Sequence, residues 1–190
     1  MSAVAVTGLL VMLLAAPPIV RAASFTLEPQ QRTDALRVGA QSITRDSFDA
    51  EWRVAGASGD SVTVITPFHR LVLAARNAAF KKEHMKESEP AKLLRDQQDR
   101  LVIWVNLHGP REDFARFYSP RILLEDREIE PAFVQNERTA VRTDAGVYRA
   151  RCVYGFPVKE MNPKARLILV VRNPDGRDVS RFTIDLASMR

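Results

Sequence analysis

The only cysteine of the chain, Cys152, lies in the segment VYRARCVYGF, next to arginines that would stabilise a reactive thiolate if they faced it. Side chains alternate between the two faces of an extended strand, so Arg149 and Arg151 point away from Cys152. The thiol shares its face with Tyr148 and Tyr154, and burial among such groups makes a thiol inert. We therefore predict that Cys152 fills a core; the alternatives are a reactive thiol and an intermolecular disulfide.

Other residues with metal-binding or nucleophilic chemistry are widely spaced. The histidines His69, His84 and His108 do not form the close pairs, such as HxH or HxxxH, that zinc sites usually contain. We predict surface or loop positions for them. Ser58 lies in GASGD, which lacks the GxSxG spacing of a nucleophile elbow and is typical of a turn.

Two pairs of carboxylates have the spacing that places both members on one strand face: Asp49 with Glu51, and Glu128 with Glu130. Cleavage of a glycosidic bond needs one carboxyl group whose pKa is raised by an apolar pocket, and nothing near these pairs supplies one. Glycine-rich phosphate-binding motifs are absent from the sequence. We therefore predict no catalytic, cofactor-binding or metal-binding residue, and no cofactor.

Two clusters are better suited to contact with another protein. One is aromatic and lies between two expected strands, where it either packs over the end of a sheet or is displayed to a partner. The other is the short basic run FKKEHMK, which is either a solvated helix end or a contact surface. The candidate partner contacts are Phe114, Phe117, Tyr118, Lys81, Lys82 and His84.

The first 22 residues have the pattern of a secretory signal peptide. An uncharged apolar run is followed by Pro17 and Pro18 and by small residues at the −3 and −1 positions of a cut before Ala23. An uncleaved membrane anchor is the alternative, because the run approaches the length of a membrane span. We predict an exported bacterial protein, periplasmic or secreted, without stable membrane insertion after cleavage.

Composition limits the remaining part, residues 23–190, to one domain of ordinary size. A single cysteine cannot form an internal disulfide, so packing alone must hold the fold. The formal net charge of the whole chain is +5, and the basic residues are spread along it rather than gathered in a block. We therefore predict a protein partner and no nucleic acid.

After the predicted signal peptide, the chain divides into four stretches of different pattern. Residues 23–34 are polar and predict a loose start, and residues 36–66 predict short strands, including AEWRV with Trp52 on its inner face. Residues 67–99 contain many helix formers, with Pro67 suited to a first helical turn, and predict a partly helical, charged insert outside the sheets.

From residue 101 onward the pattern is that of strands. The near-continuous apolar run LVIWVNL predicts a central strand with Trp104 in the core, and the turn RNPDGR predicts a hairpin near the end of the chain. Seven or more short strands at regular spacing predict a mainly β fold, an antiparallel β-sandwich.

The order of these segments resembles the immunoglobulin-like (Ig-like) sandwich of many uncharacterised exported bacterial proteins. The resemblance covers residues 101–186 and rests on LVIWVNL, an aromatic loop, ILLEDREIEPAFV, VYRARCVYGF, RLILVVRNPDG and FTIDL. It implies the fold and brings no catalytic motif. The expected function is a non-enzymatic binding or assembly module; the alternative is a hydrolase whose site is built from loops far apart in sequence.

Overall fold

A computed structural model describes residues 23–190, so the predicted signal peptide lies outside the described residues. The helices are α1 (Pro29–Gln41), α2 (Pro67–Lys81) and α3 (Glu89–Asp96), with short 3₁₀ turns at Ala50–Trp52, Ala57–Gly59 and Leu186–Ser188. The strands are β1 (Arg53–Ala55), β2 (Ser61–Ile65), β3 (Arg100–Gly109), β4 (Ser119–Leu124), β5 (Arg127–Ile129), β6 (Phe133–Gln135), β7 (Val141–Arg142), β8 (Tyr148–Pro157), β9 (Arg166–Arg172) and β10 (Asp178–Asp185). Within residues 23–190, no helix is both long and apolar enough to cross a membrane.

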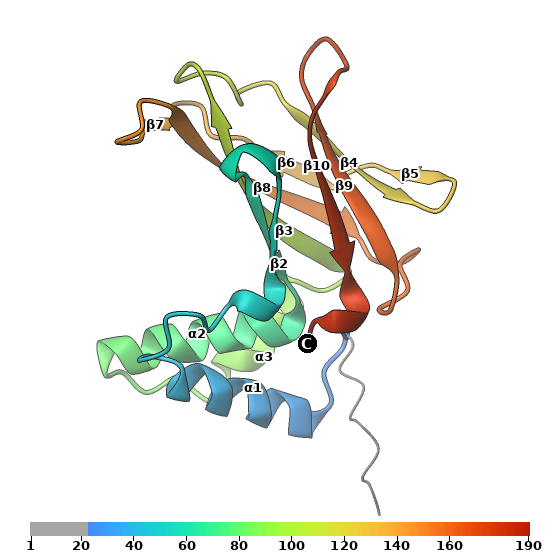
Figure 1. Cartoon of the computed structure of the whole chain (residues 1–190). Coiled ribbons are helices and arrows are strands. Elements are labelled where there is room, and N and C mark those ends of the chain that lie inside the picture. Colours follow the sequence, from blue (N-terminus) through green and yellow to red (C-terminus); the bar gives the residue numbers. More distant parts are fainter. Residues whose placement is uncertain (1–22) are drawn as a thin grey trace, which may run out of the picture.

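The strands form two antiparallel sheets, which confirms the mainly β prediction. The larger sheet has the order β1-β2-β3-β8-β6, with β7 also paired to β8, and the smaller has the order β10-β9-β4-β5. Figure 1 shows the three helices gathered at one end of the two sheets. The apolar run LVIWVNL forms β3 in the middle of the larger sheet, as predicted.

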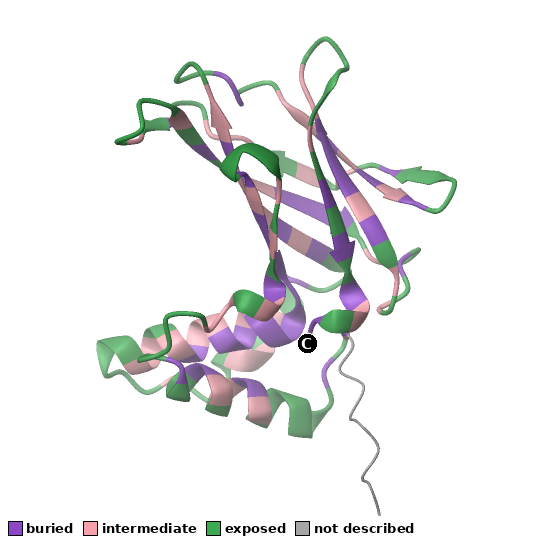
Figure 2. Ribbon diagram, in the orientation of Figure 1, coloured by how far each residue is buried: buried purple, intermediate pink, exposed green. Residues whose placement is uncertain are grey.

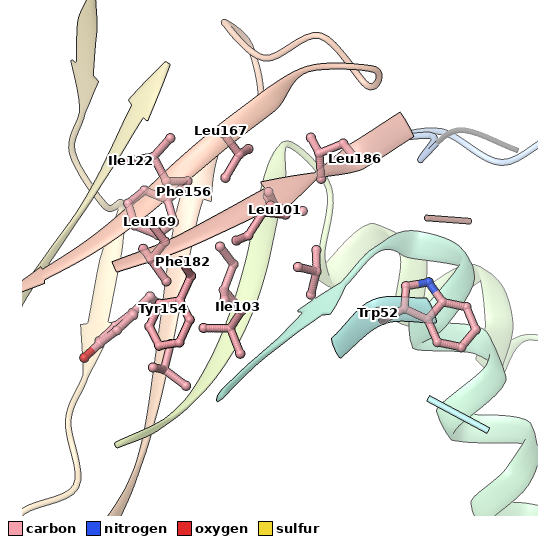
Figure 3. Close-up of a cluster of buried hydrophobic side chains, with 14 of the residues drawn as sticks. Trp52, Leu101, Ile103, Ile122, Tyr154, Phe156, Leu167, Leu169, Phe182 and Leu186 are labelled. Carbon is pink, nitrogen blue, oxygen red and sulfur yellow. The ribbon is translucent and has the colours of Figure 1, made fainter. Parts of the chain in front are cut away.

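The hydrophobic core lies between the inner faces of the two sheets (Figures 2 and 3). Every second residue is buried from Leu101 to Leu107 of β3 and from Ala150 to Phe156 of β8, because side chains of a strand alternate between its faces. The side chains from the larger sheet meet those of β4, β9 and β10. Large buried side chains of this core include Leu101, Ile103, Ile122, Tyr154, Phe156, Leu167, Leu169 and Phe182.

Cys152 belongs to this core. It is fully buried and pairs with Val105 across β3 and β8, while Arg149 and Arg151 are exposed on the opposite face. Burial raises the pKa of the thiol, so little thiolate is present at neutral pH. The prediction of a core cysteine is confirmed.

Trp104 lies on the other face of β3, so its predicted place in the sandwich core is wrong. Leu101, Ile103 and Val105 point inward, and alternation sends Trp104 outward, where it is only partly buried. There it lines two surface hollows together with Arg70 of α2 and Leu93 of α3. The run is apolar on both faces because the helices partly cover the outer one.

The charged insert is helical, as predicted, and α2 and α3 account for most of it. Pro67 occupies the first turn of α2, and the Thr66 side chain caps the helix by accepting a hydrogen bond from the His69 amide. The apolar stripe of α2, which includes Leu71 and Val72, is buried. Lys82 ends the helix in a left-handed conformation.

The prediction of a loose start followed by strands is wrong for residues 29–41, which form α1. Glu28 and Gln31 cap its first turn reciprocally, although Glu is not a common residue at the N-cap position. Gly39 lets α1 lie directly on α2: a Cβ atom at this position would be 2.4 Å from the Val72 carbonyl oxygen. Contact with α2 therefore stabilises this helix more than its own weak amphipathic pattern does.

His69 and Trp52 join the helices to the larger sheet. Trp52 forms part of a 3₁₀ turn rather than the predicted strand, and its ring stacks on His69 at 4.0 Å between centroids. Both side chains are fully buried, so the surface position predicted for His69 is wrong. The Trp52 indole N–H donates to the main-chain oxygen of Arg190, and the Arg190 guanidinium pairs with Glu51 at 2.8 Å.

Candidate partner-binding site

A surface hollow of about 420 Å³ lies where the 110–118 loop meets the edge strand β6. We call it the Phe117 site. Its lining residues are Arg116, Phe117, Val134, Gln135, Asn136 and Arg138. The loop follows β3 at the end of the sheets opposite the helices (Figure 1).

Phe114 fixes the loop to the sandwich, whereas Phe117 faces solvent. The Phe114 ring is buried over Gly109, where a Cβ atom would lie 2.4 Å from the ring, and it makes an edge contact with Tyr118 at 5.8 Å. The side chain of Phe117 is 68% exposed, which is unusual for a phenylalanine. Of the three predicted aromatic contacts, only Phe117 is thus displayed, and Phe114 packs inward.

Asn136 fixes the loop that lines the Phe117 site through hydrogen bonds. Its amide nitrogen donates to the carbonyl oxygens of Tyr118 at 2.8 Å and Arg116 at 3.4 Å. Its side-chain oxygen accepts a hydrogen bond of 3.0 Å from the hydroxyl of Tyr154, a core residue on β8. A single side chain therefore connects the loop that carries Phe117 to the centre of the larger sheet.

We expect Asn136→Ala to lower the free energy of unfolding by about 2 kcal/mol, because it leaves the buried Tyr154 hydroxyl without its acceptor. Urea denaturation at pH 7 measures the change. The double variant Asn136→Ala with Tyr154→Phe removes the orphaned hydroxyl and should recover about half of the loss. An equal loss in the single and double variants would contradict this role for the hydroxyl.

The charged residues that line the Phe117 site are all positive. Its lining contains Arg116 and Arg138 and no carboxylate. The Arg116 guanidinium lies 5.2 Å from the centre of the Phe117 ring, and neither arginine has a salt-bridge partner among residues 23–190. The hollow therefore combines exposed apolar surface with two free positive charges.

The edge of β6 supplies unpaired backbone groups beside this surface. β6 pairs with β8 through Phe133, Val134 and Gln135 and ends the order of the larger sheet. Among the described residues no strand pairs with its other side. An edge strand of this kind can accept a further strand from another chain, and Val134, 44% exposed, extends the apolar surface along it.

Comparisons with known proteins leave the family open. No protein-family model and no curated protein matches the chain. A crystal structure of a protein of unknown function from Burkholderia pseudomallei superposes with a TM-score of 0.45 at 10% sequence identity. The superposition covers 86% of this chain and 96% of that one.

The basic cluster of the sequence lies elsewhere, at the far end of α2. Lys81 and His84 line a second hollow of about 370 Å³ between α2, α3 and Trp104, and Lys82 is exposed beside it. Glu83 and Glu89 share this lining, so its charge is mixed. Figure 1 shows the two predicted clusters at opposite ends of the molecule, so the structure does not bring them together.

Phe117 is the only residue of the Phe117 site among the predicted contacts, and Asn136 and Arg138 are two of those that the sequence did not indicate. They come from the segment after β6, about 20 residues beyond the aromatic cluster, and no motif links the two segments. The sequence signal that could have indicated Asn136 is its position after a very short strand, since asparagine side chains often form hydrogen bonds with backbone groups in a turn.

Proposed function

We propose that the protein is a binding module that recognises an extended, acidic segment of a partner protein at the Phe117 site. The observation that carries this proposal is the 68% exposed Phe117, which lines a hollow with Arg116 and Arg138 and without a carboxylate. Exposed aromatic residues and arginines are the side chains most enriched where proteins bind one another. The ligand complementary to this surface carries one apolar side chain next to Asp or Glu.

Three parts of the site make different contributions to binding. Phe117 and Val134 receive the apolar side chain, and the two arginines pair with the flanking carboxylates. The free edge of β6 supplies main-chain hydrogen bonds to an extended partner segment. The Asn136 hydrogen bonds hold the loop in one conformation, so little ordering entropy is lost on binding.

We infer further that this binding takes place outside the cytoplasm and on an Ig-like sandwich. The apolar segment before Ala23, with its small residues at the cut, supports export. Two face-to-face antiparallel sheets and the order of segments from β3 to β10 support the Ig-like architecture. Sandwiches of this class carry binding sites on their end loops and sheet edges.

Selection of peptides from a random library displayed on phage tests the proposal. We expect the wild-type protein to enrich sequences that combine an aromatic or large aliphatic residue with flanking Asp or Glu. A Phe117→Ser variant should fail to enrich them, because it removes the apolar contact while leaving both arginines in place.

Phe80→Ser is the matched control, since Phe80 is also largely exposed but lies on α2, away from the Phe117 site. It should enrich the same peptides as the wild type. Enrichment of basic or charge-free peptides, or identical enrichment by wild type and Phe117→Ser, would show that the proposed site does not bind.

A further inference from the structure

A third hollow, of about 290 Å³, lies at the end of β3, beside the turn between β1 and β2 and the start of β10. It differs from the Phe117 site in chemistry, because hydroxyl, imidazole and carboxylate groups gather in its lining. The polar residues of interest are Ser58, Asp60, His108, Tyr118 and Ser180. Leu107, Phe114 and Val179 supply an apolar wall.

Asp60 and His108 form a dyad in this hollow. One carboxylate oxygen of Asp60 lies 3.2 Å from Nδ1 of His108 and also accepts the His108 main-chain N–H at 2.8 Å. The other carboxylate oxygen accepts the Ser180 hydroxyl at 2.5 Å. A carboxylate accepts, so Nδ1 carries the proton and Nε2 is left with a lone pair; this is how an acid orients a histidine that acts as a general base.

The carboxylate of the dyad is held rigidly. Asp60 is 8% exposed, and its three hydrogen bonds come from β3 and β10, which belong to different sheets. A buried carboxylate needs such donors, so its position does not depend on solvent. The imidazole of His108 is partly exposed, which leaves it reachable from the hollow.

Ser58 occupies the same hollow in a strained backbone conformation. Its φ of 57° is left-handed, which is uncommon for a residue with a side chain, and strain of this kind occurs often at active sites. The next residue, Gly59, has no side chain, and the imidazole edge of His108 approaches within 3.7 Å of where its Cβ would be. Ser58 and His108 therefore line the same hollow.

Tyr118 adds a hydrogen-bond donor to the lining. Burial, together with the nearby Asp60 charge, raises the pKa of its phenol, so the hydroxyl stays protonated at neutral pH. A neutral tyrosine hydroxyl is one of the groups that stabilise an oxyanion in acyl transfer.

We propose that this hollow is a serine hydrolase site for small carboxylic esters, with Ser58 as nucleophile, His108 as general base, Asp60 as the residue that orients it and Tyr118 as oxyanion donor. The apolar wall and the volume of about 290 Å³ suit a short acyl group. This activity is independent of partner binding at the Phe117 site.

The reaction balances with water as the only co-reactant. Ser58 Oγ attacks the ester carbonyl carbon while Nε2 of His108 takes the hydroxyl proton, and the Tyr118 hydroxyl bonds the developing oxyanion. The C–O bond to the alcohol breaks, and Nε2 returns the proton to the departing alkoxide. Water then attacks the acyl-serine, gives its proton to Nε2 and then to Ser58, and releases the carboxylic acid.

A biotinylated fluorophosphonate, which reacts with activated serines and releases fluoride, tests the proposal directly. Mass spectrometry of the intact wild-type protein should locate the adduct on Ser58. His108→Gln should slow the labelling by at least about 100-fold, because the general base is lost. No adduct on Ser58, or a labelling rate in His108→Gln within about threefold of wild type, would overturn the proposal.

Hydrolysis of p-nitrophenyl acetate is the second measurement. Ser58→Gly removes the hydroxyl and suits the left-handed backbone, so this variant keeps its fold and should lose the activity. Asp60→Asn should lower kcat by about 100-fold or more without raising KM, as expected of a positioning residue. Hydrolysis by Ser58→Gly at the wild-type rate would also overturn the proposal.

Discussion

We expect Trp52→Ala to lower the free energy of unfolding by about 3–5 kcal/mol, because it leaves a large cavity where the helices join the larger sheet. The ring is fully buried and stacks on His69 at 4.0 Å and on Phe68 at 6.3 Å. Its N–H donates to the Arg190 main-chain oxygen at 2.8 Å, so the change also breaks a contact that fixes the end of the described chain. Denaturation by guanidinium chloride, followed by far-UV circular dichroism, measures the loss.

Trp104→Ala is the matched control, because it removes the only other tryptophan of the chain. Trp104 lies on the outer face of β3 and is only partly buried, so we expect a loss of about 1 kcal/mol. Equal losses in the two variants would show that Trp104 belongs to the well-packed interior as much as Trp52 does, as the apolar run LVIWVNL alone suggests.

The stability of the protein should also fall in mild acid because of His69. Burial lowers the pKa of its imidazole from 6.5 to about 4, although the hydrogen bond from Nδ1 to the Val64 carbonyl opposes the shift. The unfolded chain therefore binds a proton at His69 below pH 6.5, whereas the folded protein does not until about pH 4. The free energy of unfolding should decrease by about 3 kcal/mol from this group as the pH falls through that window.

Urea denaturation at several pH values, for the wild type and His69→Asn, isolates this contribution. Asparagine does not titrate, and its amide can replace the Nδ1 donor to the Val64 carbonyl. The wild type should lose more stability than the variant between pH 6.5 and 4. Parallel curves for the two proteins would mean that His69 is protonated in the folded state over this range.

Side-chain alternation predicts the sheets well because it depends on local geometry alone. It places Cys152 in the core and Arg151 outside it, and the structure agrees. The same rule does not tell which face of β3 meets the other sheet, since both faces are apolar and helices partly cover the outer one. For this reason the sequence assigns Trp104 to the wrong face.

Helix α1 and the two sites depend on contacts between distant segments, and a sequence read locally does not contain them. The need for a residue without a side chain at Gly39 arises only because α1 lies on α2. The aromatic cluster indicates Phe117, but Asn136, which holds its loop, lies 19 residues further along the chain. Asp60 and His108 each look like part of an ordinary turn until β2 and β3 pair.

Fluorescence anisotropy of one labelled peptide, with a phenylalanine between aspartates and glutamates, tests the proposed binding function most directly. The variants are Arg116→Glu with Arg138→Glu, and Lys81→Glu with Lys82→Glu, which change the net charge equally at opposite ends of the molecule. We expect the arginine pair to weaken binding at least about 100-fold and the lysine pair less than about threefold at physiological salt. Equal weakening by the two pairs, or wild-type affinity in the arginine variant, would contradict recognition at the Phe117 site.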